Sequence, residues 1–205
     1  MGKLLCELKI PNNEILTQYQ TIFSDWLSKS LGGETRYHAF LKNLLEGNVT
    51  KFTEILSDYL MDALSYRDIS SDKKAEAFYH GFVAALVASV RETHWVDSNK
   101  ESGRGLYNVM LTPKSDRHHR ALILEFKHAK KAEPLDAMAE AALAQIERLE
   151  YEVVLHRYPH ATQVLKVGLA FSGKEVRAVY KEENRLTKQE SSETWTKACF
   201  REDWE

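Results

Sequence analysis

Apolar residues recur at helical spacing over most of the first ninety positions of the chain. Positions three and four apart lie on one face of a helix, so each such stretch predicts a helix with one buried side. Glycines at Gly32-Gly33 and Gly47 separate the stretches and act as stops. The predicted helices cover residues 11–31, about 34–46, about 50–65 and about 72–91. Together they predict a helical layer that closes over a core.

Beyond residue 92 the spacing changes from helical to alternating, which is typical of strands. Pro134 begins one further helix, which runs to roughly residue 151. The predicted strands lie at about 93–97, 106–112, 121–127, 164–171 and 176–180. Helices followed by a helix–strand–strand–strand–helix–strand unit predict an α/β fold or an α+β sandwich, with a central mixed sheet flanked by helices.

Residues 121–127 read Ala-Leu-Ile-Leu-Glu-Phe-Lys and carry the most informative chemistry. Alternation places Glu125 and Lys127 on one face of this strand. If the strand pairs with 106–112 so that residue 108 lies opposite 125, Asn108 joins them at about 5 Å between Cβ atoms. A carboxylate for a hard cation and a lysine for water and phosphate suit metal-assisted phosphodiester cleavage. By itself, however, Glu-X-Lys on a strand is more often a solvated edge than a site.

Composition limits what else the chain can be. Its 205 residues, 43% hydrophobic and 28% charged, fit one domain with a sizeable core. The net charge of −2 provides no overall field toward nucleic acid, so binding must depend on local clusters. Residues 112–131 form one such cluster, with six Lys or Arg against two Asp or Glu. Cys6 and Cys199 lack metal spacing, and no apolar run spans a bilayer, so we expect a cytoplasmic protein without a membrane partner.

Seven stretches, in order along the chain, resemble a PD-(D/E)XK nuclease-superfamily domain of the branch often found beside AAA-ATPase-like modules. They are 8–12, 64–66, 76–81, 98–103, 123–127, 142–147 with Tyr151, and 167–174. The resemblance covers about residues 5–180. It implies a restriction-endonuclease-like αβββαβ core at 71–180, an N-terminal helical subdomain at 1–70 and a polar C-terminal tail at 181–205.

The resemblance also implies roles for individual residues. Glu125 and Lys127 match the carboxylate and the lysine of the signature. Glu76 matches a helix glutamate that supports the metal shell in many members. Gln145 and Tyr151 match a helix motif that lies at the active site. The implied activity is endonuclease cleavage of DNA.

The implied cofactor is Mg²⁺ or Mn²⁺. Its expected ligands are Glu125, Asn108, Glu76 and the carbonyl of Phe126. Contacts to the nucleic-acid backbone are expected from a further set of residues, which are Lys130, Lys131, Tyr151 and Arg104.

Two positions depart from the family pattern. A run resembling Gly-Arg-Tyr-Asp-Ile reads Gly105-Leu106-Tyr107-Asn108-Val109 here. Asparagine keeps the shape and one acceptor oxygen of aspartate but removes a negative charge, so metal affinity should fall by at least about 10–100-fold. Two hypotheses therefore stay open: a metal-dependent endonuclease, and a catalytically dead pseudonuclease that binds nucleic acid or protein. A natural change and a deliberate one look identical at residue 108, although Leu106 favours natural drift.

Other polar and aromatic residues have ordinary interpretations. His80 is expected to be structural. His118-His119 lies in a basic turn at 113–119, which is solvated by default and contacts phosphate in a minority interpretation. Trp195, Phe200 and Trp204 either pack the tail or dock a protein partner. The oligomeric state cannot be predicted from the sequence.

Overall fold

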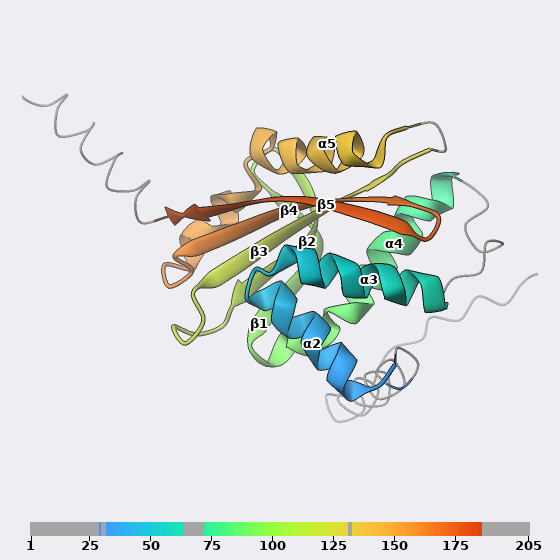
Figure 1. The fold of residues 1–205 in the computed structure, drawn as a ribbon. Helices are drawn as coiled ribbons and strands as arrows, with labels where there is room; N and C mark the ends of the chain where they lie inside the picture. Colours follow the sequence, from blue (N-terminus) through green and yellow to red (C-terminus); the bar gives the residue numbers. More distant parts are fainter. Residues whose placement is uncertain (1–28, 30–31, 64–71, 131–132, 186–205) are drawn as a thin grey trace, which may run out of the picture.

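A five-stranded mixed sheet forms the centre of the protein. The computed structural model describes residues 29, 32–63, 72–130 and 133–185 (Figure 1). The strands follow chain order across the sheet. Only β3 and β4 are parallel, and the other neighbours pair antiparallel. The strands are β1 (His94–Ser102), β2 (Gly105–Pro113), β3 (Arg120–His128), β4 (Gln163–Ser172) and β5 (Glu175–Asn184).

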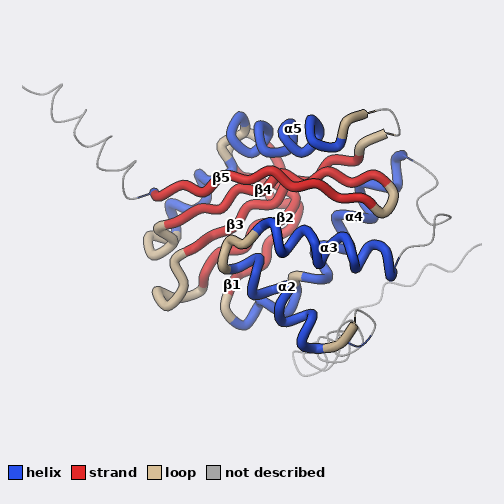
Figure 2. The backbone as a smooth tube through the Cα atoms, viewed as in Figure 1, coloured by secondary structure: helices blue, strands red, loops and turns tan. Residues whose placement is uncertain are grey.

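Helices cover both faces of this sheet (Figures 1 and 2). One face carries the helices of the first half of the chain, which are α2 (Glu34–Leu45), α3 (Val49–Ala63) and α4 (Asp72–Leu86). The other face carries α5 (Leu135–Arg148) and the 3₁₀ helix η2 (Tyr151–Arg157). A second 3₁₀ helix, η1 (Ala88–Glu92), leads into β1. None of the described helices is long and apolar enough to cross a membrane.

Alternation along β3 divides its side chains between two cores. Leu122, Leu124 and Phe126 pack with α2, α3 and α4 in the larger core. Ala121 and Ile123 pack with α5 and η2 in the smaller one. Because side chains two apart share a face, the odd-numbered polar residues of β3 are directed toward α5.

The α/β prediction with an αβββαβ core is confirmed, since α4, β1, β2, β3, α5 and β4 follow in that order. The predicted lengths of the two edge strands, β1 and β5, were wrong. β1 extends to Ser102 rather than 97, and β5 extends to Asn184 rather than 180. Both strands have largely exposed polar stretches, so they lack the apolar alternation on which the prediction depended. The predicted helix at 11–31, Cys6, Cys199 and the tail aromatics lie outside the described residues.

Two predicted helices are shorter than expected. The helix predicted to reach 91 ends at Leu86 and continues as η1. The helix predicted to reach 151 ends at Arg148, because Glu150 takes a left-handed conformation with φ 55° and ψ 43°. The β1–β2 hairpin packs against this break: the backbone amide of Arg104 donates to the carbonyl of Leu149 at 2.8 Å. A Cβ at Gly103 would lie 2.1 Å from the same carbonyl oxygen, so only glycine fits there.

His94 makes the stability of the fold dependent on pH. It is 2% exposed, and burial, assisted by the nearby His118, lowers its pKa to about 4. The unfolded chain binds a proton below about pH 6.5, and the folded chain resists this proton until about pH 4. Stability should therefore fall by up to about 3 kcal/mol as the pH drops through this window. Urea unfolding at pH 7 and pH 4.5 measures the loss. His94→Gln should lose clearly less between the two pH values, and an equal loss would contradict the prediction.

Candidate active site

Strands β2 and β3 part where the sequence places its polar residues. Their backbone pairing covers Leu111↔Leu122 to Val109↔Leu124, so the register sets residue 108 opposite 125, as predicted. Beyond these pairs, side-chain oxygens accept the hydrogen bonds between the two strands. The amide N–H of Asn108 donates to Glu125 Oε2 at 3.3 Å, and the amide N–H of Phe126 donates to Asn108 Oδ1 at 2.6 Å. The strand ends thus open around two polar side chains.

These contacts fix the orientation of the Asn108 side chain. The Phe126 amide can only donate, so the oxygen of the Asn108 amide faces it and the Nδ2 group points the other way. An aspartate here could make the same bond with one oxygen and keep a second anionic oxygen for a cation. Asparagine presents an N–H donor in its place. The metal-binding capacity expected of position 108 is therefore reduced by geometry as well as by charge.

Gln145 links the acid and the lysine of β3. Its Oε1 accepts from Lys127 Nζ at 2.5 Å, and its Nε2 donates to Glu125 Oε1 and to the Tyr151 hydroxyl. Glu125 is 2% exposed, whereas Lys127 is partly exposed. One chain of hydrogen bonds therefore holds the charged pair against α5.

Tyr151 links this chain of hydrogen bonds to β2. Its hydroxyl donates to the carbonyl of Leu106 at 2.6 Å and accepts from Gln145. Burial raises the pKa of Tyr151, the hydrogen bond from Gln145 lowers it, and the charge of Glu125 raises it further. The neutral phenol can therefore keep donating. Tyr151 lies at the start of η2 rather than on the helix that carries Gln145, which corrects the predicted helix motif.

The family comparison can now be set beside this geometry. The family model described as the PD-(D/E)XK nuclease superfamily matches residues 74–181. This range includes every residue of the hydrogen-bonded cluster, which consists of Asn108, Glu125, Lys127, Gln145 and Tyr151. The chain belongs to the PD-(D/E)XK nuclease superfamily. Comparison with curated proteins gave no match. In this PD-(D/E)XK domain, Glu125 and Lys127, the residues expected to carry the signature, both lie at the point where β2 and β3 separate.

Four other predicted site residues lie apart from the cluster or cannot be placed. Glu76 lies on α4, but its side chain is not among the described ones, and Lys131 lies outside the described residues. Arg104 is exposed and lies 3.4 Å from Glu150. Lys130 is exposed, and its backbone amide donates to Glu133. The metal contact expected of Glu76 and the contacts to nucleic acid expected of the other three residues stay predictions.

His80 contributes more to the site than the sequence indicated. Its Nε2 lies 3.0 Å from the carbonyl oxygen of Asn108 and 2.8 Å from Ser98 Oγ. A carbonyl only accepts, so Nε2 carries the proton. His80 thereby ties α4 to β1 and to the backbone of β2 at Asn108. The available signal was its position one turn after Glu76 on a helix that matches the family.

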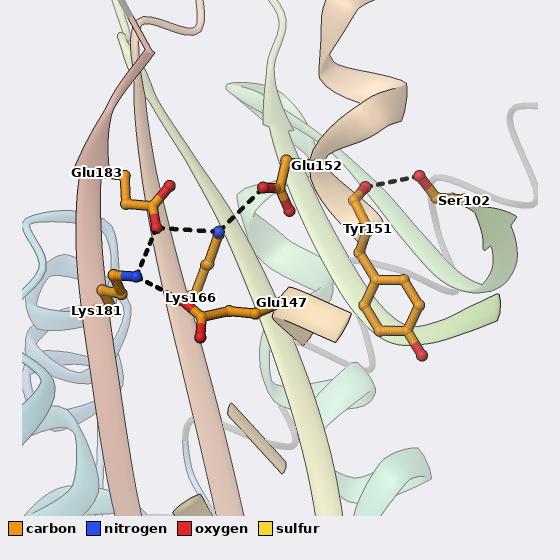
Figure 3. A network of polar contacts seen from close by, with 7 residues as sticks. All are labelled: Ser102, Glu147, Tyr151, Glu152, Lys166, Lys181 and Glu183. Atoms are coloured by element: carbon orange, nitrogen blue, oxygen red, sulfur yellow. Dashed lines mark hydrogen bonds and ion pairs between the residues drawn. The ribbon is translucent and has the colours of Figure 1, made fainter. Parts of the chain in front are cut away.

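An ionic network centred on the buried Lys166 supports the helices behind the site (Figure 3). Lys166 on β4 is 2% exposed and pairs with Glu152 on η2 at 3.1 Å and with Glu183 on β5 at 3.2 Å. Lys181 pairs with Glu183 at 3.0 Å and with Glu147 on α5 at 2.5 Å. Glu147 and Glu152 are each within two residues of a member of the cluster, so the network helps to hold Gln145 and Tyr151 in place.

The fit of a metal to these residues is partial. Glu125 supplies one buried carboxylate, whose oxygens already accept from Asn108 and Gln145. Within the part of the chain that the structure describes, no three His, Cys, Asp or Glu side chains gather as a metal-binding group. Divalent metals are general in this superfamily. The described residues therefore suit a weakly held ion better than a tightly held one.

Replacing Gln145 with leucine tests the hydrogen-bonded cluster. The change removes a donor from the buried Glu125 and an acceptor from Lys127, so the free energy of unfolding should fall by about 1–3 kcal/mol. Urea unfolding measures it. Glu140→Leu, on the exposed side of the same helix, is the matched control and should change stability by less than about 0.5 kcal/mol. Equal effects of the two changes would show that Gln145 does not hold the pair.

Proposed function

We propose that this chain hydrolyses phosphodiester bonds in nucleic acid, with DNA as the substrate, in a metal-dependent reaction that Asn108 slows. One observation carries the proposal. Glu125, Lys127 and Gln145 share a single hydrogen-bonded cluster with Asn108 inside the segment that matches the nuclease superfamily. Cytoplasmic location and association with an AAA-ATPase-like protein stay predictions.

The residues of the cluster suit distinct parts of this reaction. Glu125 and the carbonyl of Phe126 would hold Mg²⁺ or Mn²⁺, and such an ion supplies polarisation of the phosphate and a more acidic water. Lys127 is partly exposed, so its ammonium can meet a phosphate oxygen and orient the attacking water. Gln145 keeps that ammonium directed at the site. Its amide, being neutral, does not draw the lysine into a competing ion pair.

A second function is favoured by the orientation of Asn108. With its oxygen bonded to Phe126, the amide presents N–H groups that can donate to a phosphate oxygen without any metal. Together with Lys127, this arrangement suits binding of the nucleic-acid backbone without cleavage. A pseudonuclease of this kind would have the same affinity for DNA with and without a divalent ion.

Nicking of supercoiled plasmid with Mg²⁺ or Mn²⁺ distinguishes the two functions. For the slowed hydrolase we expect weak nicking by the unmodified chain, more by Asn108→Asp, and none by Lys127→Ala or by the double variant. For the pseudonuclease we expect no nicking by the unmodified chain, although filter binding still detects its binding to DNA. Absence of both nicking and DNA binding in the unmodified chain and in Asn108→Asp would overturn the nucleic-acid assignment altogether.

Metal binding provides a separate measurement. Asn108→Asp should raise the affinity for Mn²⁺ by about 10–100-fold in calorimetry, because it restores an anionic oxygen beside Glu125. Asn99→Asp is the matched control. Asn99 lies on β1 between Ser98 and Lys100, which pair with Val109 and Tyr107; it is exposed and receives the same added charge. A gain in Asn99→Asp as large as that in Asn108→Asp would show that general electrostatics, rather than a ligand at 108, governs binding.

A further inference from the structure

Two cavities lie away from the candidate active site and differ in charge. The cavity between α3 and β5 has a volume of about 420 Å³, and its charged lining is Glu54, Asp58 and Arg177. A second one, of about 230 Å³, lies where the β2–β3 turn meets the α2–α3 turn; we call it the sheet-end cavity. Acids outnumber cations in the first cavity. The second has the opposite balance.

Basic and imidazole side chains dominate the lining of the sheet-end cavity. Arg117, His118, His119 and Arg120 come from the β2–β3 turn and the start of β3, and Glu46 is the one acid among the lining residues. Glu46 is largely exposed and lies 3.9 Å from Lys42, which offsets part of its charge. The cavity therefore attracts anions.

Two of these residues have donors to offer a ligand. Arg120 already binds Glu182 and the carbonyl of Leu45, and His119 Nδ1 contacts the carbonyl of His160. By contrast, no hydrogen-bond or ion-pair partner is found for the side chains of Arg117 and His118 within the described residues. A guanidinium and an imidazole at one small cavity suit the oxygens of a tetrahedral anion.

The buried His94 also indicates that the sheet-end cavity favours an anion. It lines the cavity at 2% exposure, and its ring lies 5.3 Å from that of His118. After burial, the charges of His118 and Lys114 are the influences that lower the pKa of His94. The local field is therefore unfavourable to a further cation and favourable to an anion.

We propose that the sheet-end cavity binds a phosphate group through Arg117 and His118. Its volume is below the range of about 300–1,000 Å³ that is usual for larger ligands, and it suits a phosphate or a small part of a phosphorylated molecule. The basic turn at 113–119 is thus a binding element rather than only a solvated loop.

This site is separate from the candidate active site. Arg120 and Glu125 are five residues apart on β3, which corresponds to about 16 Å at the rise of a strand. They also lie on opposite faces: Arg120 contacts the α2–α3 turn, whereas Glu125 contacts α5. Phosphate binding here does not depend on hydrolysis at Glu125 and Lys127, and its failure would leave the proposed function untouched.

Titration of the full chain with sodium phosphate, at ionic strength held constant with NaCl and followed by NMR, tests the proposal. We expect saturable shifts of the His118 and Arg117 signals. Arg117→Ala and His118→Ala should each weaken binding by at least about tenfold. Arg177→Ala, which replaces an arginine lining the other cavity, is the matched control and should bind phosphate like the unmodified chain.

A short single-stranded DNA with and without a 5′-phosphate identifies the source of the phosphate. If both forms bind and both lose affinity in Arg117→Ala, the site takes the nucleic-acid backbone. If only the 5′-phosphorylated form and free phosphate bind, it takes a phosphate monoester. Absence of saturable binding, equal weakening in Arg177→Ala, or loss in Lys127→Ala but not in Arg117→Ala would each overturn the proposal.

Discussion

Replacing Lys166 with methionine should lower the free energy of unfolding by about 3 kcal/mol, the lower end of the range for breaking a buried ion pair. The ammonium is 2% exposed and lies between Glu152 and Glu183 (Figure 3). Without the ammonium, Glu183 keeps its ion pair with Lys181, but Glu152 loses its ion pair with Lys166. The Oε2 atom of Glu152 is already buried without a hydrogen-bond partner. Because the side chain of Glu152 is 30% exposed, water offsets part of the loss. Urea unfolding at pH 7 measures the effect.

Lys51→Met is the matched control for Lys166→Met. Lys51 pairs with Glu54 at 2.7 Å, but both side chains are 57% exposed. Exposed pairs contribute about 0–1 kcal/mol, so the same substitution should cost little there. Adding Glu152→Leu to Lys166→Met should recover part of the loss, since it removes the unpaired carboxylate. Equal costs for Lys51→Met and Lys166→Met would show that the network does not stabilise η2.

The sequence predicted how Asn108, Glu125 and Lys127 are arranged because that arrangement is local. Glu125 and Lys127 share a strand, and the pairing of neighbouring strands set Asn108 opposite Glu125. The period of two then determined which side chains share a face. No knowledge of distant segments was needed for this step.

The supporting residues depend on contacts that no local pattern indicates. Lys166 interrupts an apolar strand run, yet its partners Glu152 and Glu183 come from two other elements. Tyr151 reaches Leu106 only because Glu150 turns left-handed and ends the helix early. The orientation of the Asn108 amide likewise follows from the opening of β2 and β3, which the hairpin register alone does not reveal.

Gly168 was visible in the sequence only as part of a matching stretch, but its position explains how α5 reaches the site. It is the Cα partner of Glu125 on the neighbouring strand β4. A Cβ there would lie 2.3 Å from the carbonyl oxygen of Ala139 and 2.5 Å from the backbone nitrogen of Leu143, both on α5. The helix backbone thus packs directly on the sheet, and this close approach brings Gln145 within reach of Glu125 and Lys127.

Gly168→Ala should therefore lower the free energy of unfolding by about 3 kcal/mol, the upper end for overpacking, because rigid backbone rather than a flexible side chain meets the new methyl group. α5 must move outward, so Gln145 should lose its bonds to Lys127 and Glu125, and NMR signals of Lys127 should shift. Gly81→Ala is the matched control: apart from its chain neighbours and the nearby backbone of its own helix, no described atom lies within 4 Å of its added Cβ, and alanine favours the helix. A loss below about 1 kcal/mol in Gly168→Ala, with Lys127 signals unchanged, would show that the backbone of α5 does not pack directly on β4.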